Sequence, residues 1–436
     1  MKKSRVARLA VPVAVAIALV VFFSAWLPFS GRSARAAATA PLGRLRLPPP
    51  DGRFAVGTVS LHLIDRSRKN PWAATPPYRE LMVSVWYPAR DAGRYPLAPQ
   101  MLPGAAAHYG SQDGYGWLGY RVPPGTIDWS ATMTSGHVDA PVASAGNGHR
   151  FPVVLYSPPL EEPRTWETTL VQDLASRGYV VVTMDPTYEA SEVEFPGGRL
   201  IDSEVPQWFT QAQQDKDVPA LMEKILNVRV ADTQFVLGQL TALAAGRESD
   251  AGGHWLPQGL PGAMDLRRVG MFGVSAGGIT TAEAMYSDSR IKAGIDLDGN
   301  VDSPLLPAGD FLSPVWRDGL DQPFMFMGDP KTDHNSVPSW RSFWTHTRGW
   351  HLDLTLDGAS GENSYKDAVP LIPQIARELR LPRSFVTNDI GSIVPAQAIT
   401  AEEAYVSAFF DRWLRGHDTG LLDGPSPRYP DITFVK

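Results

Sequence analysis

A serine flanked by glycines has the spacing of a hydrolytic nucleophile. Residues 273–277 read Gly-Val-Ser-Ala-Gly, with an apolar run at 269–272 before them and a helical pattern at 278–287 after them. This strand–turn–helix setting is the one in which a G-x-S-x-G motif lifts its serine above a sheet, because glycines allow a very tight turn. The alternative is the glycine-rich turn of a nucleotide-binding fold, which aims its glycines at a phosphate and needs no serine at the apex. We therefore predict that Ser275 is a nucleophile.

A carboxylate follows the next predicted strand. Asp298 ends the run 293–298 on the crevice side, where it could orient an imidazole and stabilise its cation. Asp296 lies two residues earlier and deeper, and Asp329 is a second candidate at the same edge. The alternative for Asp298 is a strand-end aspartate that caps the following loop. We expect Asp298 to be the catalytic acid.

The elements that must position these residues alternate between strands and helices. Apolar runs typical of strands buried on both faces occur at 151–156, 179–184, 269–274, 293–297, 323–327 and 352–356. Helical patterns occur at 165–177, 218–245, 278–287, 337–347, 365–379 and 401–415. The near-alternating segments 54–64 and 79–87 predict an antiparallel pair at a sheet edge. The order predicts an α/β fold with a mainly parallel, doubly wound sheet, an antiparallel N-terminal edge, and a ligand crevice at the carboxyl ends of the strands.

Two segments interrupt this alternation. Residues 91–150 are rich in Gly, Pro, Ala and aromatic residues and show no sustained period, and residues 187–216 include Trp208 and Phe209. We expect these two excursions to form a lid and an acyl-binding wall. Ordinary loop packing is the alternative.

Several blocks resemble a known family in their order and spacing. They are Gly-Val-Ser-Ala-Gly-Gly at 273–278, Ile-Asp-Leu-Asp at 295–298, Val-Pro-Ser-Trp at 337–340 and Glu-Leu-Met-Val-Ser-Val-Trp-Tyr-Pro at 80–88. From about residue 50 to the C-terminus the chain resembles the secreted α/β-hydrolases related to plasma platelet-activating factor acetylhydrolase, isoform II. The resemblance implies an α/β-hydrolase fold and hydrolysis of short or oxidised acyl esters by a Ser-Asp-His triad, without metal or cofactor. It assigns Ser275 as nucleophile, Asp298 as triad acid, and the N–H groups of Ala276 and Leu160 as the oxyanion hole.

The chain departs from this family at the triad histidine. The turn after the last strand reads Gly-Ala-Ser-Gly-Glu-Asn-Ser-Tyr at 358–365, so Glu362, or alternatively Gly361, stands where the base belongs. No histidine lies between His351 and His417. Other family residues are replaced at Ser157-Pro158-Pro159-Leu160-Glu161, Asp185-Pro186 and Val274. A serine hydroxyl is a weak nucleophile without a base, so this loss should lower the rate by several orders of magnitude.

Three interpretations of the missing histidine remain open. In the first, another group is the base: His334, in the loop after the run ending at Met327, or Glu362, if it is buried enough to accept a proton near neutral pH. His351 precedes its strand and should lie at the opposite end. In the second, the site is repurposed for acyl transfer, elimination or cyclisation on a secondary metabolite. In the third, the protein is a non-catalytic extracellular binding homologue. A polar loop residue and a solvated turn carboxylate are the plain alternatives for His334 and Glu362.

The loop of the second oxyanion donor has an unusual composition. Pro158 and Pro159 have no N–H, whereas Leu160 keeps one, so the oxyanion hole can survive. Glu161 and Glu162 follow directly. They would disfavour an anionic intermediate unless they point to solvent.

Composition excludes several classes of protein. The 436 residues are 43% hydrophobic and 20% charged, which excludes a disordered, fibrous or polytopic membrane protein. Lys and Arg number 40 against 46 Asp and Glu, and no basic stripe occurs, so no nucleic-acid partner is expected. The chain has no cysteine, hence no disulfide, thiolate metal site or cysteine nucleophile. The expected partner is a small-molecule or lipid ester.

Residues 1–38 have the pattern of a secretory signal. Basic residues precede the uncharged, mostly apolar stretch 9–29, and the small-residue run 36–40 follows it. The alternative is an uncleaved anchor, because the stretch could nearly span a bilayer, and the segment would then contact a membrane surface. Both place residues 39–436, which we expect to form a single domain, outside the cytoplasm.

Overall fold

The centre of the molecule is a long mixed sheet. The computed structural model describes residues 42–146, 148–247, 249–302 and 313–436, so the predicted signal segment lies outside the described residues. Within them an 11-stranded sheet has the order β13-β12-β11-β10-β9-β5-β6-β2-β1-β4-β3, and β7 and β8 form a separate pair. The strands are β1 (Ala55–Lys69), β2 (Tyr78–Ala89), β3 (Leu97–Pro99), β4 (Met133–Val138), β5 (Phe151–Ser157), β6 (Val180–Asp185), β7 (Val193–Phe195), β8 (Arg199–Ile201), β9 (Met264–Val274), β10 (Ile291–Leu297), β11 (Phe324–Gly328), β12 (His351–Leu356) and β13 (Ile432–Phe434).

The strands from β12 to β6 in this order all run parallel. They are the six apolar runs predicted from the sequence, and β5 is buried along its whole length. Successive side chains of a strand point to opposite faces, so β5 contributes Val154 and Tyr156 to one core and Val153 and Leu155 to the other. The continuous apolar runs therefore have a physical cause: both faces of this part of the sheet are covered.

The predicted antiparallel pair is confirmed. β1 and β2 pair from Ala55↔Ala89 onward, and β2 runs antiparallel to β6. They are not the outermost strands, however, because β3 and β4, both from the 91–150 excursion, extend the sheet beyond β1. Three-residue strands such as β3 and β13 are too short to show a period, which is why neither was predicted.

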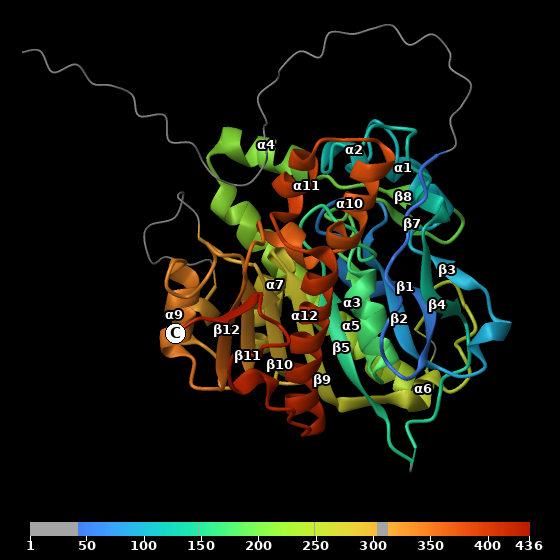
Figure 1. The fold of residues 1–436 in the computed structure, drawn as a ribbon. Coiled ribbons are helices and arrows are strands. Elements are labelled where there is room, and N and C mark those ends of the chain that lie inside the picture. The colour runs from blue at the N-terminus through green and yellow to red at the C-terminus, as the bar shows by residue number, and fades with distance from the viewer. Residues whose placement is uncertain (1–41, 147, 248, 303–312) are drawn as a thin grey trace, which may run out of the picture.

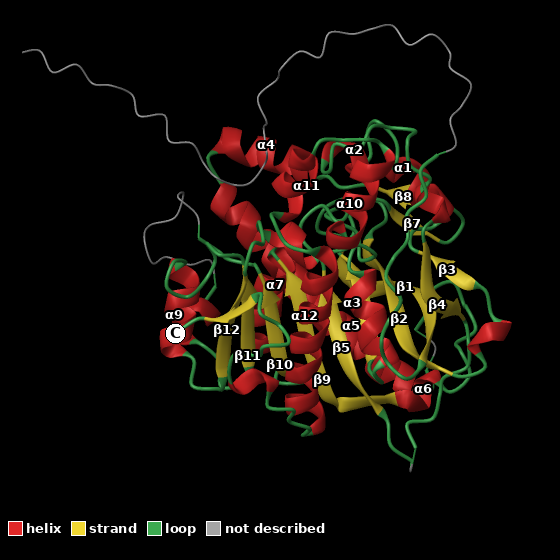
Figure 2. Ribbon diagram, viewed as in Figure 1, coloured by secondary structure: helices red, strands yellow, loops and turns green. Residues whose placement is uncertain are grey.

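Helices cover both faces of the sheet (Figures 1 and 2). One face packs against α5 (Val218–Ala244), α7 (Ala276–Ser287), α8 (Val315–Asp318) and α9 (Pro338–His346). The other packs against α3 (Thr168–Ser176), α10 (Ala368–Glu378) and α12 (Pro395–Phe410), with a π-helical turn at Asp411–Arg415. The helix-on-both-faces prediction is confirmed.

Smaller elements gather at one end of the sheet. Figure 1 shows α1, α2, α4, α10 and α11 together above the strands. The remaining helices are α1 (Pro103–Tyr109), α2 (Tyr115–Leu118), α4 (Val205–Asp215), α6 (Leu260–Ala263) and α11 (Arg383–Ile390), with 3-10 turns at Ala92–Arg94, Trp129–Ala131, Glu362–Tyr365 and Leu421–Asp423. In the described ranges no helix combines the length and the apolar character needed to cross a bilayer.

Candidate active site

Ser275 lies at the turn between β9 and α7. Its backbone angles are φ 54° and ψ −119°, a strained conformation for a residue with a side chain, costing of order 1–3 kcal/mol. Its N–H donates to Leu297 O at 2.9 Å, which ties the turn to β10. A Cβ atom on Gly273 would overlap the backbone of Gly277, so the turn can close this tightly only with glycine at position 273. The Ser275 side chain is partly exposed between buried neighbours.

The two backbone N–H groups predicted to bind an oxyanion have no hydrogen-bond acceptor among the residues that the structure describes. Ala276 is the first residue of α7, where helix N–H groups have no intrahelical acceptor. Leu160 lies in the loop after β5, and no hydrogen bond between described residues uses its N–H. A Cβ atom on Gly277 would overlap the Ser157 carbonyl oxygen, so this loop packs directly against the turn that carries Ser275. The close packing brings the two predicted donor segments together.

Asp298 follows β10, the strand next to β9. It adopts φ 59°, and its N–H donates to Met327 O at 2.9 Å. Its Oδ1 accepts the Asp329 N–H at 3.1 Å. Burial raises the pKa of Asp298 to about 8; the Asp329 and Glu362 carboxylates add to the rise, and the hydrogen bond from Asp329 opposes it. The Asp298 carboxyl is therefore largely protonated at pH 7.

The other two aspartates of this edge accept hydrogen bonds from turns. Asp296 is fully buried and its Oδ1 accepts the Gly299 N–H at 2.8 Å. Asp329 is nearly buried and its Oδ2 accepts the Gly361 N–H at 3.0 Å. Both carboxyl groups shape the backbone next to Asp298.

Comparison with known proteins identifies the family. A family model described as "Platelet-activating factor acetylhydrolase, isoform II" matches residues 45–327. The chain belongs to this family. Its membership places the chain among carboxylic-ester hydrolases of the α/β-hydrolase fold, as the sequence resemblance implied.

Several proteins that are similar to this chain are named as esterases. A probable 1-alkyl-2-acetylglycerophosphocholine esterase of Arthroderma benhamiae is 28% identical over 411 residues, 89% of this chain and 93% of that protein. A platelet-activating factor acetylhydrolase of Gallus gallus is 22% identical over 199 residues, 42% of this chain and 45% of that protein. The solved structure of a ferulic acid esterase from Streptomyces cinnamoneus has a TM-score of 0.68 and 31% identity, and the match covers 90% of this chain and 99% of that one.

Gly361 lies at the position that faces the Asp298 carboxyl group. A Cβ atom on Gly361 would lie 3.8 Å from Asp298 Oδ2. Its angles, φ 67° and ψ −168°, belong to a region that only glycine enters readily. Of the two positions that the sequence offered for the triad histidine of the acetylhydrolase family, Gly361 is thus the one directed at Asp298.

Glu362 opens the 3-10 turn Glu362–Tyr365 and points elsewhere. Its Oε1 pairs with Lys366 Nζ at 3.2 Å, and its side chain is 39% exposed. Lys366 is fully buried and also pairs with Glu162 Oε1 at 2.7 Å. Glu362 lies close enough to Asp298 to raise the pKa of that carboxyl, but its own carboxylate is engaged by an ammonium group.

His334 is held by the carboxylate of Asp353. Its N–H and its ring Nδ1 both lie 2.7 Å from Asp353 Oδ2, and its ring stacks on Trp344 at 4.0 Å between centroids. Asp353 belongs to β12, three strand-to-strand steps from β9, or about 14 Å. These contacts suit the plain alternative of a structural loop residue. A role for His334 as the base stays a prediction.

The two glutamates after Leu160 differ in their surroundings. Glu162 is buried, and its Oε1 accepts hydrogen bonds from Lys366 Nζ at 2.7 Å and from Tyr120 OH at 2.6 Å. Glu161 is partly exposed; burial, and next the charge of Glu162, raises its pKa to about 7. The Glu161 carboxyl group, next to the predicted donor Leu160, is therefore mainly neutral below about pH 7 and mainly charged above it.

The aromatic residues of the excursions pack largely into the body. Tyr109 and Trp129 are buried against Trp166, with ring centroids 5.1 and 5.9 Å from it. Trp208 stacks on Trp72 at 3.9 Å. Ordinary packing accounts for these side chains. An acyl-binding role for the rest of the excursions stays a prediction.

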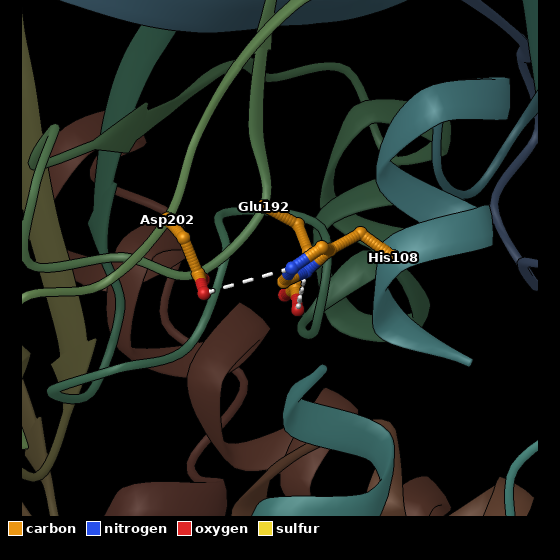
Figure 3. Close-up of side chains that lie close together, drawn as sticks. All are labelled: His108, Glu192 and Asp202. Carbon is orange, nitrogen blue, oxygen red and sulfur yellow. Dashed lines mark hydrogen bonds and ion pairs between the residues drawn. The ribbon is translucent and has the colours of Figure 1, made fainter. Parts of the chain in front are cut away.

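A histidine links the two excursions (Figure 3). The His108 ring of α1 lies between Glu192 and Asp202, with Nδ1–Oε1 at 3.2 Å and Nε2–Oδ2 at 3.9 Å. These three groups are near enough to hold a metal ion. The carboxylates meet opposite nitrogens of one ring, however, which suits an imidazolium between two anions better than three ligands of one ion. The hydrogen bond to Glu192 raises the pKa of His108, burial opposes the rise, and Asp202 adds to it.

Proposed function

We propose that this protein is an extracytoplasmic serine carboxylic-ester hydrolase with Ser275 as its nucleophile. The observation that carries the proposal is the strained φ of 54° at Ser275, on a strand–helix turn beside the free N–H of Ala276. Backbone strain of this kind persists where the surrounding structure imposes it, and such sites are often catalytic. The loop of Leu160, packed against the same turn, supports a second oxyanion donor.

In this proposal the Ser275 hydroxyl attacks the acyl carbon of an ester while a base removes its proton. Ala276 and Leu160 N–H groups stabilise the negative oxygen of the tetrahedral intermediate. The alcohol leaves with a proton, and water then hydrolyses the acyl-enzyme to the acid. Asp298 is the acid of the site. Glu362, which follows Gly361 in the sequence, is the candidate base, and it would have to leave its ion pair with Lys366 to accept the proton.

The proposed substrate is a small-molecule or lipid ester with a short or oxidised acyl group. Two related proteins named above act, by their names, on an acetylated glycerophosphocholine and on a ferulic acid ester. The shared chemistry is an ester carbonyl, whereas the alcohols differ. We further propose that residues 1–38 direct a single hydrolase domain, 39–436, out of the cytoplasm.

A fluorophosphonate probe tests the nucleophile. The wild type should be labelled and should hydrolyse p-nitrophenyl acetate, and Ser275→Ala should lose both, because the hydroxyl is the atom that attacks. Ser287→Ala, at the exposed other end of α7, is the matched control and should keep both. Labelling that survives Ser275→Ala would show that another residue reacts.

Gly361 favours a second candidate. A glycine directed at Asp298 leaves the acid without the imidazole that a hydrolytic triad needs. The site would then be a repurposed one that runs acyl transfer, elimination or cyclisation, or a pocket of a non-catalytic binding homologue. A folded wild type that neither reacts with the probe nor releases p-nitrophenol favours this candidate over ester hydrolysis.

A further inference from the structure

A buried arginine holds the loop that carries Leu160. Arg229, on α5, is 2% exposed, and its guanidinium group reaches two consecutive carbonyl groups of this loop. Nη1 donates to Pro158 O at 2.6 Å, and Nη2 donates to Pro159 O at 3.1 Å. Nε donates to the fully buried Glu189 Oε2 at 2.6 Å, which supplies the opposite charge. No motif or spacing in the sequence points to Arg229 or Glu189.

The bond to Pro159 O also orients the Leu160 N–H. The Pro159 carbonyl and the Leu160 N–H belong to one peptide unit, which is planar and trans, so the two groups point in opposite directions. Because the Pro159 carbonyl group points toward Arg229, the Leu160 N–H must point away from Arg229. A charged donor on the carbonyl also polarises the peptide, which makes its N–H a stronger donor.

The loop has few other means of holding this geometry. Pro158 and Pro159 contribute no N–H, so they cannot be tied down through their own donors. Their buried carbonyl groups still need partners. Beyond Leu160, the Ser191 N–H donates to Glu161 O at 3.0 Å, in the same segment that supplies Glu189. Arg229 and Glu189 are thus the side chains that anchor the loop just before its predicted oxyanion donor.

We propose that Arg229, with Glu189 as its counter-ion, is a positioning residue that aims the Leu160 N–H at the oxyanion. The inference rests on the proposed function insofar as Leu160 is an oxyanion donor. Arg229 acts through the loop and touches no reacting atom.

The test separates positioning from stability. The variant Arg229→Met with Glu189→Gln removes the guanidinium group without leaving an unpaired buried charge. We expect kcat for p-nitrophenyl acetate to fall by roughly 10- to 100-fold, with KM changed by less than about threefold, because a misaimed donor weakens transition-state binding. Arg229→Lys, whose ammonium group can reach one carbonyl, should lose less.

A second buried arginine pair provides the matched control. Arg79 is fully buried, pairs with Asp232 at 2.6 Å, and donates to Thr187 O at 2.8 Å. Asp232 lies one turn from Arg229 on α5. Arg79→Met with Asp232→Asn should lower the melting temperature about as much but leave kcat of the folded enzyme near the wild-type value. If both double variants keep kcat, or both lose it equally, the positioning role is overturned.

A wild type without esterase activity would overturn the proposed function alone. Hydrogen exchange would still test whether Arg229 anchors the loop. Amide exchange over residues 157–164 should still be faster in the Arg229 double variant than in the Arg79 control, because the loop has lost its anchor. Equal exchange in the two would overturn the anchoring.

Discussion

The Asp298 carboxyl group faces a glycine where a triad acid would face an imidazole. The position directed at its Oδ2 belongs to Gly361, and the charges that raise its pKa, those of Asp329 and Glu362, are themselves acidic. Burial and these like charges together keep its pKa near 8. An imidazolium at this place would stabilise the carboxylate instead. The raised pKa thus follows mainly from burial, and the glycine at position 361 offers no imidazolium to offset it.

This pKa predicts a pH dependence of turnover. Asp298 is neutral below about pH 8 and ionised above it, so a reaction that needs the carboxylate should show kcat/KM rising through about pH 8. Asp298→Asn should abolish this rise. Asp329→Asn removes a neighbouring negative charge and should move the midpoint to lower pH. Rates measured from pH 5 to 9.5 check the prediction, and a flat wild-type profile would contradict it.

The two candidate bases give opposite expectations. Glu362→Gln should lower kcat by at least about 100-fold if the carboxylate removes the serine proton. His334→Ala should leave kcat near the wild-type value but destabilise the fold by about 1–3 kcal/mol, because buried Asp353 loses its partner. Kinetics with p-nitrophenyl acetate and urea denaturation measure both effects. Wild-type rates in both variants would remove both assignments.

At the scale of elements, the site depends on two turns that pack without side chains between them. The loop after β5 lies against the first turn of α7, and the contact is between the Ser157 carbonyl and the Cα of Gly277. No residue larger than glycine fits there unless one turn moves. This contact therefore helps to set the distance between the two predicted oxyanion donors.

Gly277→Ala should separate the turns. The added methyl would overlap Ser157 O, so we expect a loss of stability of about 1–3 kcal/mol and a fall in kcat of at least about tenfold. Gly238→Ala is the matched control, because Gly238 is inside α5 with open space around its Cα. It should stabilise the protein by about 0.5–1 kcal/mol and leave kcat unchanged. Thermal unfolding and steady-state rates decide, and a fully active Gly277→Ala would contradict the packing argument.

At the scale of the molecule, buried acidic side chains outnumber buried cationic ones among the described residues. Glu167, Glu402 and Asp367 lie where α3, α10 and α12 meet, and none of them exposes more than 7% of its surface. Burial raises the pKa of Asp367 to about 6 and, with neighbouring carboxyl groups, raises the pKa of Glu167 and Glu402 well above the usual range. On the opposite face of the sheet, burial raises the pKa of Glu283 to about 7. The folded protein therefore binds more protons near neutral pH than the unfolded chain does.

Stability should accordingly fall as the pH rises. Each raised carboxyl group contributes fully below its unfolded pKa, about 4.5 for Glu, and loses that contribution as the pH rises through its folded pKa. We expect a higher melting temperature at pH 5 than at pH 8 at equal ionic strength. Glu402→Gln should reduce this difference, and the exposed control Glu223→Gln should not. A melting temperature that is higher at pH 8 would contradict the prediction.

Local sequence patterns were sufficient to predict the central sheet with its helices. They were also sufficient to single out two residues of the candidate site. The six parallel strands followed from apolar runs buried on both faces, and each predicted helix of the body is present within a few residues. Ser275 and Asp298 were singled out because each directly follows a strand, and the carboxyl ends of neighbouring parallel strands meet at one edge. A sequence carries this information because strand period, glycine spacing and strand order are local or sequential properties.

Only the tertiary structure decided what surrounds those two residues. That Gly361 faces Asp298, that His334 pairs with Asp353, and that Arg229 holds the loop of Leu160 are contacts between distant segments. No period or spacing encodes them, because they depend on which strands lie side by side and on how closely two turns approach. The sequence by itself thus determined the family, the sheet and the position of the candidate serine, whereas packing across the sheet determined which side chains surround that serine.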